Sequence, residues 1–119
     1  MKNLITTLSC AGALLFCSSA LATLFTVPTA KTQTIQAAID AANQNGDEIM
    51  VLPGVYFEQI NYLGKSVRIY SQGGAIMTYI DGQSTSGPLV TFHTAEDENA
   101  ILEGFTVRNA PSRAGISAH

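Results

Sequence analysis

The sequence predicts an all-β solenoid, a coil of parallel strands in which each turn packs on the turn before it. Ile80-Asp81-Gly82 and Leu102-Glu103-Gly104 repeat the same aliphatic-acid-Gly order 22 positions apart, which is a solenoid spacing. Val67–Tyr70 and Leu89–Phe92 alternate apolar and polar residues at a similar distance, as strands with one buried face do. We therefore expect about three rungs of strands.

The first 22 residues have the features of a secretory signal peptide. Lys2 supplies a positive charge, an apolar run extends from Leu4 to Phe16, and Ala20-Leu21-Ala22 is a small-x-small cleavage site. Serines interrupt this run, which is already too short to span a bilayer. We expect cleavage after Ala22, a secreted or periplasmic location, and no membrane span in the mature chain.

Composition narrows the possible partners of the mature chain. Both cysteines, Cys10 and Cys17, lie inside the predicted signal peptide, so no disulfide is expected after cleavage. Of the six basic and nine acidic residues, only Lys2 is lost with the peptide. A mildly acidic chain without basic clusters argues against a nucleic-acid partner, whose phosphates need a positive surface.

Residues 23–33 are predicted to form a short leader, broken by Pro28, and residues 34–46 a helix. Thr34 can act as the N-cap of this helix, and Gly46 can end it by adopting the left-handed conformation. Apolar residues recur between them at helical spacing, at Ile35, Ala38, Ile39 and Ala42. One helix in a strand-rich chain is best used as a cap on the first rung, whose edge would otherwise be open.

Residues 47–119 are predicted to form the rungs, aligned in two columns. The first column holds Ile60-Asn61, Ile80-Asp81 and Leu102-Glu103, and the second holds Val67/Ile69, Val90/Phe92 and Ile116/Ala118. Residues 80 and 102 should then lie on one wall of the coil. Neighbouring segments joined as hairpins, or these two residues on unrelated walls, would contradict the coil itself. The alternative is an antiparallel β-sandwich, which the scarcity of two-residue Asn-Gly or Asp-Gly turns disfavours.

A family resemblance supports the same fold. The chain resembles the opening of secreted bacterial members of the right-handed parallel β-helix, or pectin-lyase-like, superfamily over the stretch TIQAAIDAANQNGDEIMVLPGVYFEQI. Four later stretches are similar to the first rungs of that superfamily: SVRIYS, TYIDG, LVTF and ILEGFTVRNA. The resemblance implies a right-handed parallel β-helix with an N-terminal α-helical cap. Members usually carry many more rungs, so we expect an N-terminal fragment, truncated at the C-terminus, whose uncapped last rung could self-associate.

Four residues are candidates for binding. Asp81 and Glu103 share a predicted column, so stacking could raise the pKa of one carboxyl and create an acid/base pair or a cation site. The simpler interpretation is that each is a solvated acid at a strand-to-turn corner. Arg68 and Arg108 could bind the carboxylates of an acidic polysaccharide through forked hydrogen bonds, but two arginines on different columns do not make one site.

Other chemistry-bearing side chains are weaker candidates. Glu96-Asp97-Glu98 could hold Ca²⁺ but lacks the spaced ligands of a dedicated loop, and His93 alone does not make a metal site. We therefore expect no cofactor, and Ca²⁺ is the alternative. Four tyrosines could stack on sugar rings if they line one outer face: Tyr56, Tyr62, Tyr70 and Tyr79.

No catalytic set is present. Resemblance to a polygalacturonase would require an Asn-x-Asp with a later Asp-Asp, a Gly-His-Gly and an Arg-x-Lys, and the sequence has none of these motifs. Resemblance to a pectin methylesterase would require a set of Gln, Asp and Arg residues, which the sequence also lacks. Because this superfamily carries many activities on one scaffold, we expect an exported segment with a carbohydrate-binding or structural role. The alternative is the N-terminal part of a polysaccharide-active enzyme (pectate lyase, polygalacturonase, pectinesterase or epimerase-like) whose active site lies beyond residue 119.

Overall fold

The computed structural model describes residues 21–43, 46–83, 86–92, 99–110 and 116–118. These residues form short strands and one helix in the order β1 (Leu24–Val27), α2 (Ile35–Ala41), β2 (Glu48–Val51), β3 (Gly54–Tyr56), β4 (Ile60–Asn61), β5 (Arg68–Ser71), β6 (Thr78–Asp81), β7 (Val90–Phe92), β8 (Ile101–Glu103), β9 (Thr106–Arg108) and β10 (Ile116–Ala118). The predicted signal peptide falls almost wholly outside the described residues.

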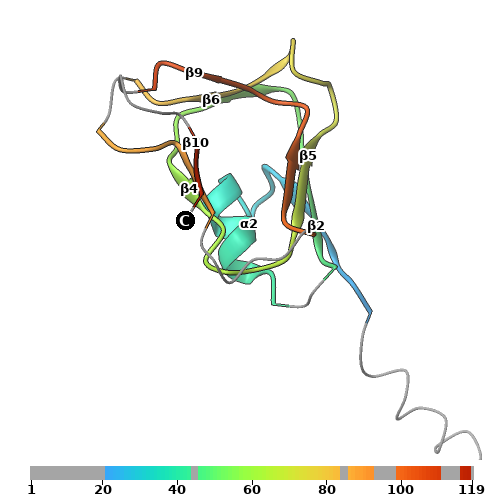
Figure 1. Cartoon of the computed structure of the whole chain (residues 1–119). Coiled ribbons are helices and arrows are strands. Elements are labelled where there is room, and N and C mark those ends of the chain that lie inside the picture. The colour runs from blue at the N-terminus through green and yellow to red at the C-terminus, as the bar shows by residue number, and fades with distance from the viewer. Residues whose placement is uncertain (1–20, 44–45, 84–85, 93–98, 111–115, 119) are drawn as a thin grey trace, which may run out of the picture.

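The strands build three sheets that wrap around a common interior (Figure 1). The sheet orders are β1-β2-β5-β8 for the first sheet, β3-β6-β9 for the second and β10-β7-β4 for the third. Every pair of neighbouring strands in these orders is parallel. The chain is therefore a β-solenoid of about three turns, which confirms the predicted coil and excludes the antiparallel sandwich.

The first predicted column was wrong and the second was correct in part, although the solenoid is present. Val90 and Phe92 pair with Ile116 and Ala118 as predicted, but Ile69 belongs to the first sheet. Ile80 pairs with Tyr56 and Val107 in the second sheet, whereas Leu102 pairs with Ile69 in the first. Residues 80 and 102 thus lie on separate walls, which is the result that was expected to contradict the coil. The coil is nevertheless present, because all the strand pairs are parallel. The cause is unequal loop length, because Arg68 follows its partner Glu48 by 20 positions while Ile101 follows its partner Arg68 by 33.

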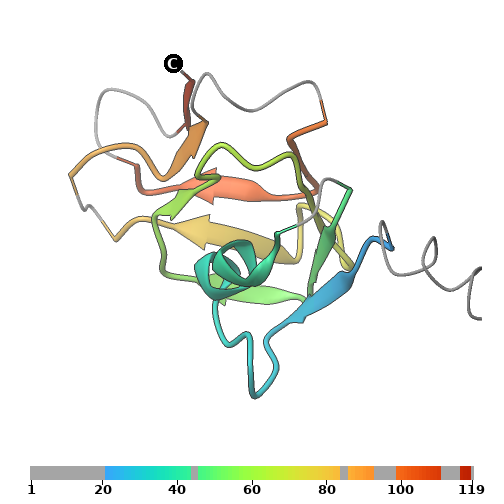
Figure 2. The same cartoon turned by 90° about the horizontal axis from the view of Figure 1, so that it is seen from below.

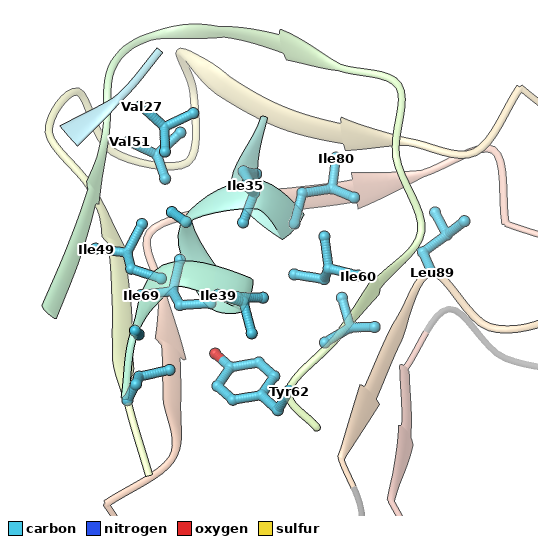
Figure 3. Close-up of a cluster of buried hydrophobic side chains, with 14 residues drawn as sticks. Val27, Ile35, Ile39, Ile49, Val51, Ile60, Tyr62, Ile69, Ile80 and Leu89 are labelled. Carbon is cyan, nitrogen blue, oxygen red and sulfur yellow. The ribbon is translucent and has the colours of Figure 1, made fainter. Parts of the chain in front are cut away.

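Inward-facing aliphatic side chains form the core between the three sheets (Figure 3). Ile49 and Ile69 are neighbours in the first sheet, and both are fully buried, as is Ile80 of the second sheet. The Tyr62 ring stacks on Phe92 with centroids 4.3 Å apart. Its hydroxyl donates to the Ile101 carbonyl at 2.7 Å, so this tyrosine is part of the core.

The helix and the leader differ from their predicted bounds. Helix α2 begins after Thr34, whose hydroxyl accepts from the Ala37 N–H as predicted, but it ends at Ala41. Gly46 has a φ of 95° and lies in the turn before β2, so it is not the helix stop. The leader contains β1, which pairs in parallel with β2. None of the described helices is long and apolar enough to cross a bilayer.

Candidate functional site

The four predicted binding residues form two arginine–carboxylate pairs. Arg68 Nε donates to Glu103 Oε1 at 3.0 Å, between β5 and β8. Arg108 Nε donates to Asp81 Oδ2 at 2.7 Å, between β9 and β6. Each pair joins two consecutive turns, but the pairs belong to different sheets.

Arg68 lies at the centre of a cluster on the outer face of the first sheet. Besides Glu103, its guanidinium reaches Glu48 Oε2 at 3.3 Å, so it links β2, β5 and β8. The same guanidinium lies 4.2 Å from the centroid of the Tyr70 ring. The hydrogen bond between Arg68 and Glu103 raises the pKa of the arginine and lowers that of the carboxyl. Both groups are therefore held in their charged forms.

Asp81 is the centre of the second cluster, on the outer side of the second sheet. Its side chain is nearly inaccessible, with 5% exposed, whereas that of Arg108 is 43% exposed. The carboxylate accepts two bonds from Asn109 Nδ2, at 2.9 and 3.0 Å, and one from the Gln83 N–H at 2.9 Å. These bonds, led by those from Asn109, and the bond from Arg108 lower the Asp81 pKa. Arg108 also stacks on Tyr79, 4.4 Å from the ring centroid.

Two expectations about the carboxylates are corrected. Asp81 and Glu103 do not stack, and each has its pKa lowered by hydrogen bonds, so they are not an acid/base pair. Asp81 is also not a solvated corner residue, because it is buried. Arg68 and Arg108 lie on different sheets, as their different predicted columns implied, and each is already paired with a carboxylate, so they do not form one anion site.

The tyrosines do not line one face. Tyr62 is buried, Tyr70 lies in the first sheet and Tyr79 in the second, and the Tyr56 hydroxyl donates to the Leu52 carbonyl at 2.7 Å. His93 and Glu96-Asp97-Glu98 lie outside the described residues. Within the described part of the chain, no three His, Cys, Asp or Glu side chains group closely enough to hold a metal ion.

A pocket of about 400 Å³ opens beside the Arg68 cluster. Its lining comes from three separate stretches of the chain: Gly46, Asp47, Glu48, Ser66, Arg68, Asn99 and Ile101. Asp47 has a structural task there, because its oxygens accept from the Thr23 N–H at 2.8 Å and the Asn43 N–H at 3.1 Å. Asp47 and Glu48 bring two carboxylates to this pocket, whereas Arg68 brings one guanidinium that is already paired. The pocket is therefore unfavourable for a polyanion.

Sequence reasoning missed most of this lining. Glu48, Ser66 and Asn99 carry no local motif, and only the parallel register brings their turns together. A second hollow of about 110 Å³ beside Asp81 is smaller than the usual range for small-ligand pockets.

Comparisons with protein-family models, curated proteins and solved structures give no match.

Proposed function

We propose that this chain is a structural segment of an exported right-handed parallel β-helix of the pectin-lyase-like kind. The observation that carries the proposal is the use of its charged side chains. These side chains form ion pairs between consecutive turns, Arg68 with Glu103 and Arg108 with Asp81, and they do not converge on one place where a ligand could bind. Such pairs hold neighbouring turns in register, which a scaffold needs and a catalytic face does not provide.

In this proposal helix α2 is the N-terminal cap of the solenoid. It contacts β1, β2 and β4 at the N-terminal end of the coil, and it buries Ile35, Ala38 and Ile39 in the core. The Gln36 amide accepts from the Asn61 N–H at 2.7 Å and donates to the Asn61 carbonyl at 3.1 Å. A side chain thus takes the place that a neighbouring strand would have beside β4.

Side chains from the first turn also fix both ends of this helix. Glu58 accepts from the Ile35 N–H at 2.9 Å and from the Gln36 N–H at 3.0 Å, at the positive end of the helix dipole. Lys65 Nζ donates to the last carbonyls, those of Ile39 at 2.7 Å and Ala42 at 2.6 Å. Both contacts support a fixed cap.

A double-mutant cycle with a binding assay tests the structural role. Arg68→Met, Glu103→Gln and the double variant are compared by urea unfolding and by retention on polygalacturonate and neutral glucan, with and without Ca²⁺. We expect the two substitutions to be non-additive in stability, because the side chains touch, and to leave retention unchanged. Additive effects on stability would contradict the proposal. Turnover or retention of polygalacturonate would contradict it too, if Arg68→Met abolishes that turnover or retention.

A separate experiment tests the predicted export. N-terminal sequencing of the exported chain should find Thr23 as its first residue.

A second candidate function is binding of a neutral saccharide in the pocket beside Arg68. The supporting observation is a polar lining of carboxylates, a hydroxyl and a guanidinium, with a volume of about 400 Å³ that lies in the usual range for small ligands. Saturable binding of a neutral oligosaccharide, lost in Arg68→Met and kept in Arg108→Met, would favour it over the purely structural role. Arg108 is the matched control because it also pairs with a carboxylate and stacks on a tyrosine.

A further inference from the structure

The main-chain nitrogen of Thr23 lies against a buried carboxylate. It donates to Asp47 Oδ1 at 2.8 Å, and Asp47 is only 1% exposed. Thr23 comes directly before β1 and Asp47 directly before β2, so the parallel pairing of these two strands sets the contact. Figure 2 shows β1, drawn in blue, beside β2 at the edge of the first sheet.

Main-chain bonds fix both partners of this contact. The Thr23 carbonyl accepts from the Glu48 N–H at 2.9 Å, and the Asp47 carbonyl accepts from the Arg68 N–H at 3.3 Å. The second carboxylate oxygen of Asp47, Oδ2, accepts from the Asn43 N–H at 3.1 Å. The nitrogen of residue 23 is therefore held at the carboxylate by the fold, and not by a flexible surface side chain.

The predicted cleavage site falls on this nitrogen. In the uncleaved chain it is a neutral amide with a single N–H. Hydrolysis of the Ala22–Thr23 peptide bond consumes one water and yields an Ala22 carboxylate and a Thr23 ammonium, so the nitrogen gains two hydrogens and a positive charge. A charged donor bonds a carboxylate about twice as strongly as a neutral donor does. A buried carboxylate gains more from it than an exposed one, because less water screens the pair.

We propose that removal of the signal peptide completes the fold by creating an ion pair between the Thr23 ammonium and Asp47. The inference rests on the proposed export and on cleavage after Ala22. The pair ties the start of β1 to β2, so the mature chain is more stable than its precursor. Because the gain comes only with cleavage, the precursor stays easier to unfold until its signal peptide has been removed.

Acetylation of the mature amino terminus tests the pair. An acetyl group on Thr23 takes the place of the Ala22 carbonyl, so the N–H that faces Asp47 is kept and only the charge is lost. Residues 23–119 are compared by urea unfolding with a free and with an acetylated amino terminus. We expect acetylation to raise the unfolding equilibrium constant about tenfold at pH 7 and to have little effect in Asp47→Asn. Asp40→Asn, at an exposed helix position, is the matched control and should keep the full effect of acetylation.

The pH dependence separates the charge from the hydrogen bond. An α-ammonium has an ordinary pKa of about 7.7–8.0, and a carboxylate partner raises that pKa. The advantage of the free chain over the acetylated chain should therefore be complete below this ordinary value and be lost as pH rises through the folded pKa. The other charged groups on the surrounding elements are the same in both chains, so their effects cancel: Asp40, Glu48, Lys65 and Arg68.

Three results would overturn the ion pair: equal stability of the free and acetylated chains at pH 7, equal effects of acetylation in wild type and Asp47→Asn, or an effect that does not change with pH. The pH comparison uses the wild-type chain alone, so it decides the question even if Asp47→Asn does not fold. N-terminal sequencing distinguishes this inference from the export on which it rests. An exported chain that begins elsewhere contradicts the cleavage prediction, whereas a chain that begins at Thr23 and is unaffected by acetylation contradicts the ion pair alone.

Discussion

At the scale of single residues, Asp81 has the most completely used carboxylate of the candidate residues. It accepts bonds from Asn109, Arg108 and the Gln83 N–H, and it is almost inaccessible to solvent. An aspartate with these donors is stabilised in its charged form, which is why its pKa is lowered. The same bonds that suit a structural staple make this carboxylate a poor general acid at neutral pH.

Asp81 should make the stability of the fold sensitive to acid. Because its pKa is lower in the folded chain, the stabilisation is fully present above the unfolded value of about 3.9 and is lost as pH falls through the folded pKa. We expect Asp81→Asn to lower the urea midpoint at pH 7 and to remove part of the decline below about pH 4. Asp40→Asn, at an exposed helix position, is the control. Parallel pH profiles for wild type and Asp81→Asn would refute this role.

The four candidate residues show what sequence patterns supply and what they leave out. Acids beside Gly and arginines in strands pointed to four residues that the structure places in two ion pairs, but the pattern paired Asp81 with Glu103. The true partners, Arg108 for Asp81 and Arg68 for Glu103, lie 27 and 35 positions away. Those distances depend on the loops between strands, and neither composition nor alternation determines them.

At the scale of elements, helix α2 shows that local signals are more predictable than tertiary ones. The Thr34 N-cap was predictable because its bond to Ala37 spans only three residues. The C-terminal end was not, because Lys65, from a different part of the turn, takes the carbonyls that a left-handed glycine usually covers. Strand β1 was missed because a four-residue strand before a proline has little periodicity.

Gln36 should contribute to stability out of proportion to its size. Gln36→Ala leaves the Asn61 N–H and carbonyl in edge strand β4 without their partner, so we expect a loss of about 1–2 kcal/mol in the free energy of unfolding. Gln33→Ala, at an exposed position just before the helix, should change it by less than about 0.5 kcal/mol. Chemical denaturation measures both, and equal effects would exclude the strand-like role of Gln36.

Lys65 should stabilise the carboxyl end of α2. Lys65→Met keeps most of the aliphatic stem but removes the donor to the Ile39, Asp40 and Ala42 carbonyls, so we expect a loss of about 1 kcal/mol. Lys31→Met, at an exposed site, is the control and should be close to neutral. Faster amide exchange at the end of α2 in Lys65→Met alone would confirm the contact, and identical behaviour of both variants would exclude it.

At the scale of the whole molecule, the fold class was predictable and the register was not. Short apolar runs between turn signals require a fold that buries one face of many short strands, and a parallel coil does so. Which strands become neighbours depends on how far each loop carries the chain around the coil. The loops here give steps of 20 to 33 positions within the first sheet alone, so an alignment with nearly constant steps placed Ile80 and Leu102 together.

The true columns make a final prediction about stability. Ile69 lies between Ile49 and Leu102 in the first sheet and is completely buried. Ile69→Ala should therefore open a cavity in the middle turn and lower the free energy of unfolding by about 2–5 kcal/mol. Ile76→Ala removes the same atoms at a site that is 80% exposed, and it should cost less than about 0.5 kcal/mol. Each turn of a solenoid is supported only by its neighbours, so the loss of amide protection in Ile69→Ala should extend to β2 and β8. A loss of protection confined to β5 would contradict the stacking of Ile49, Ile69 and Leu102.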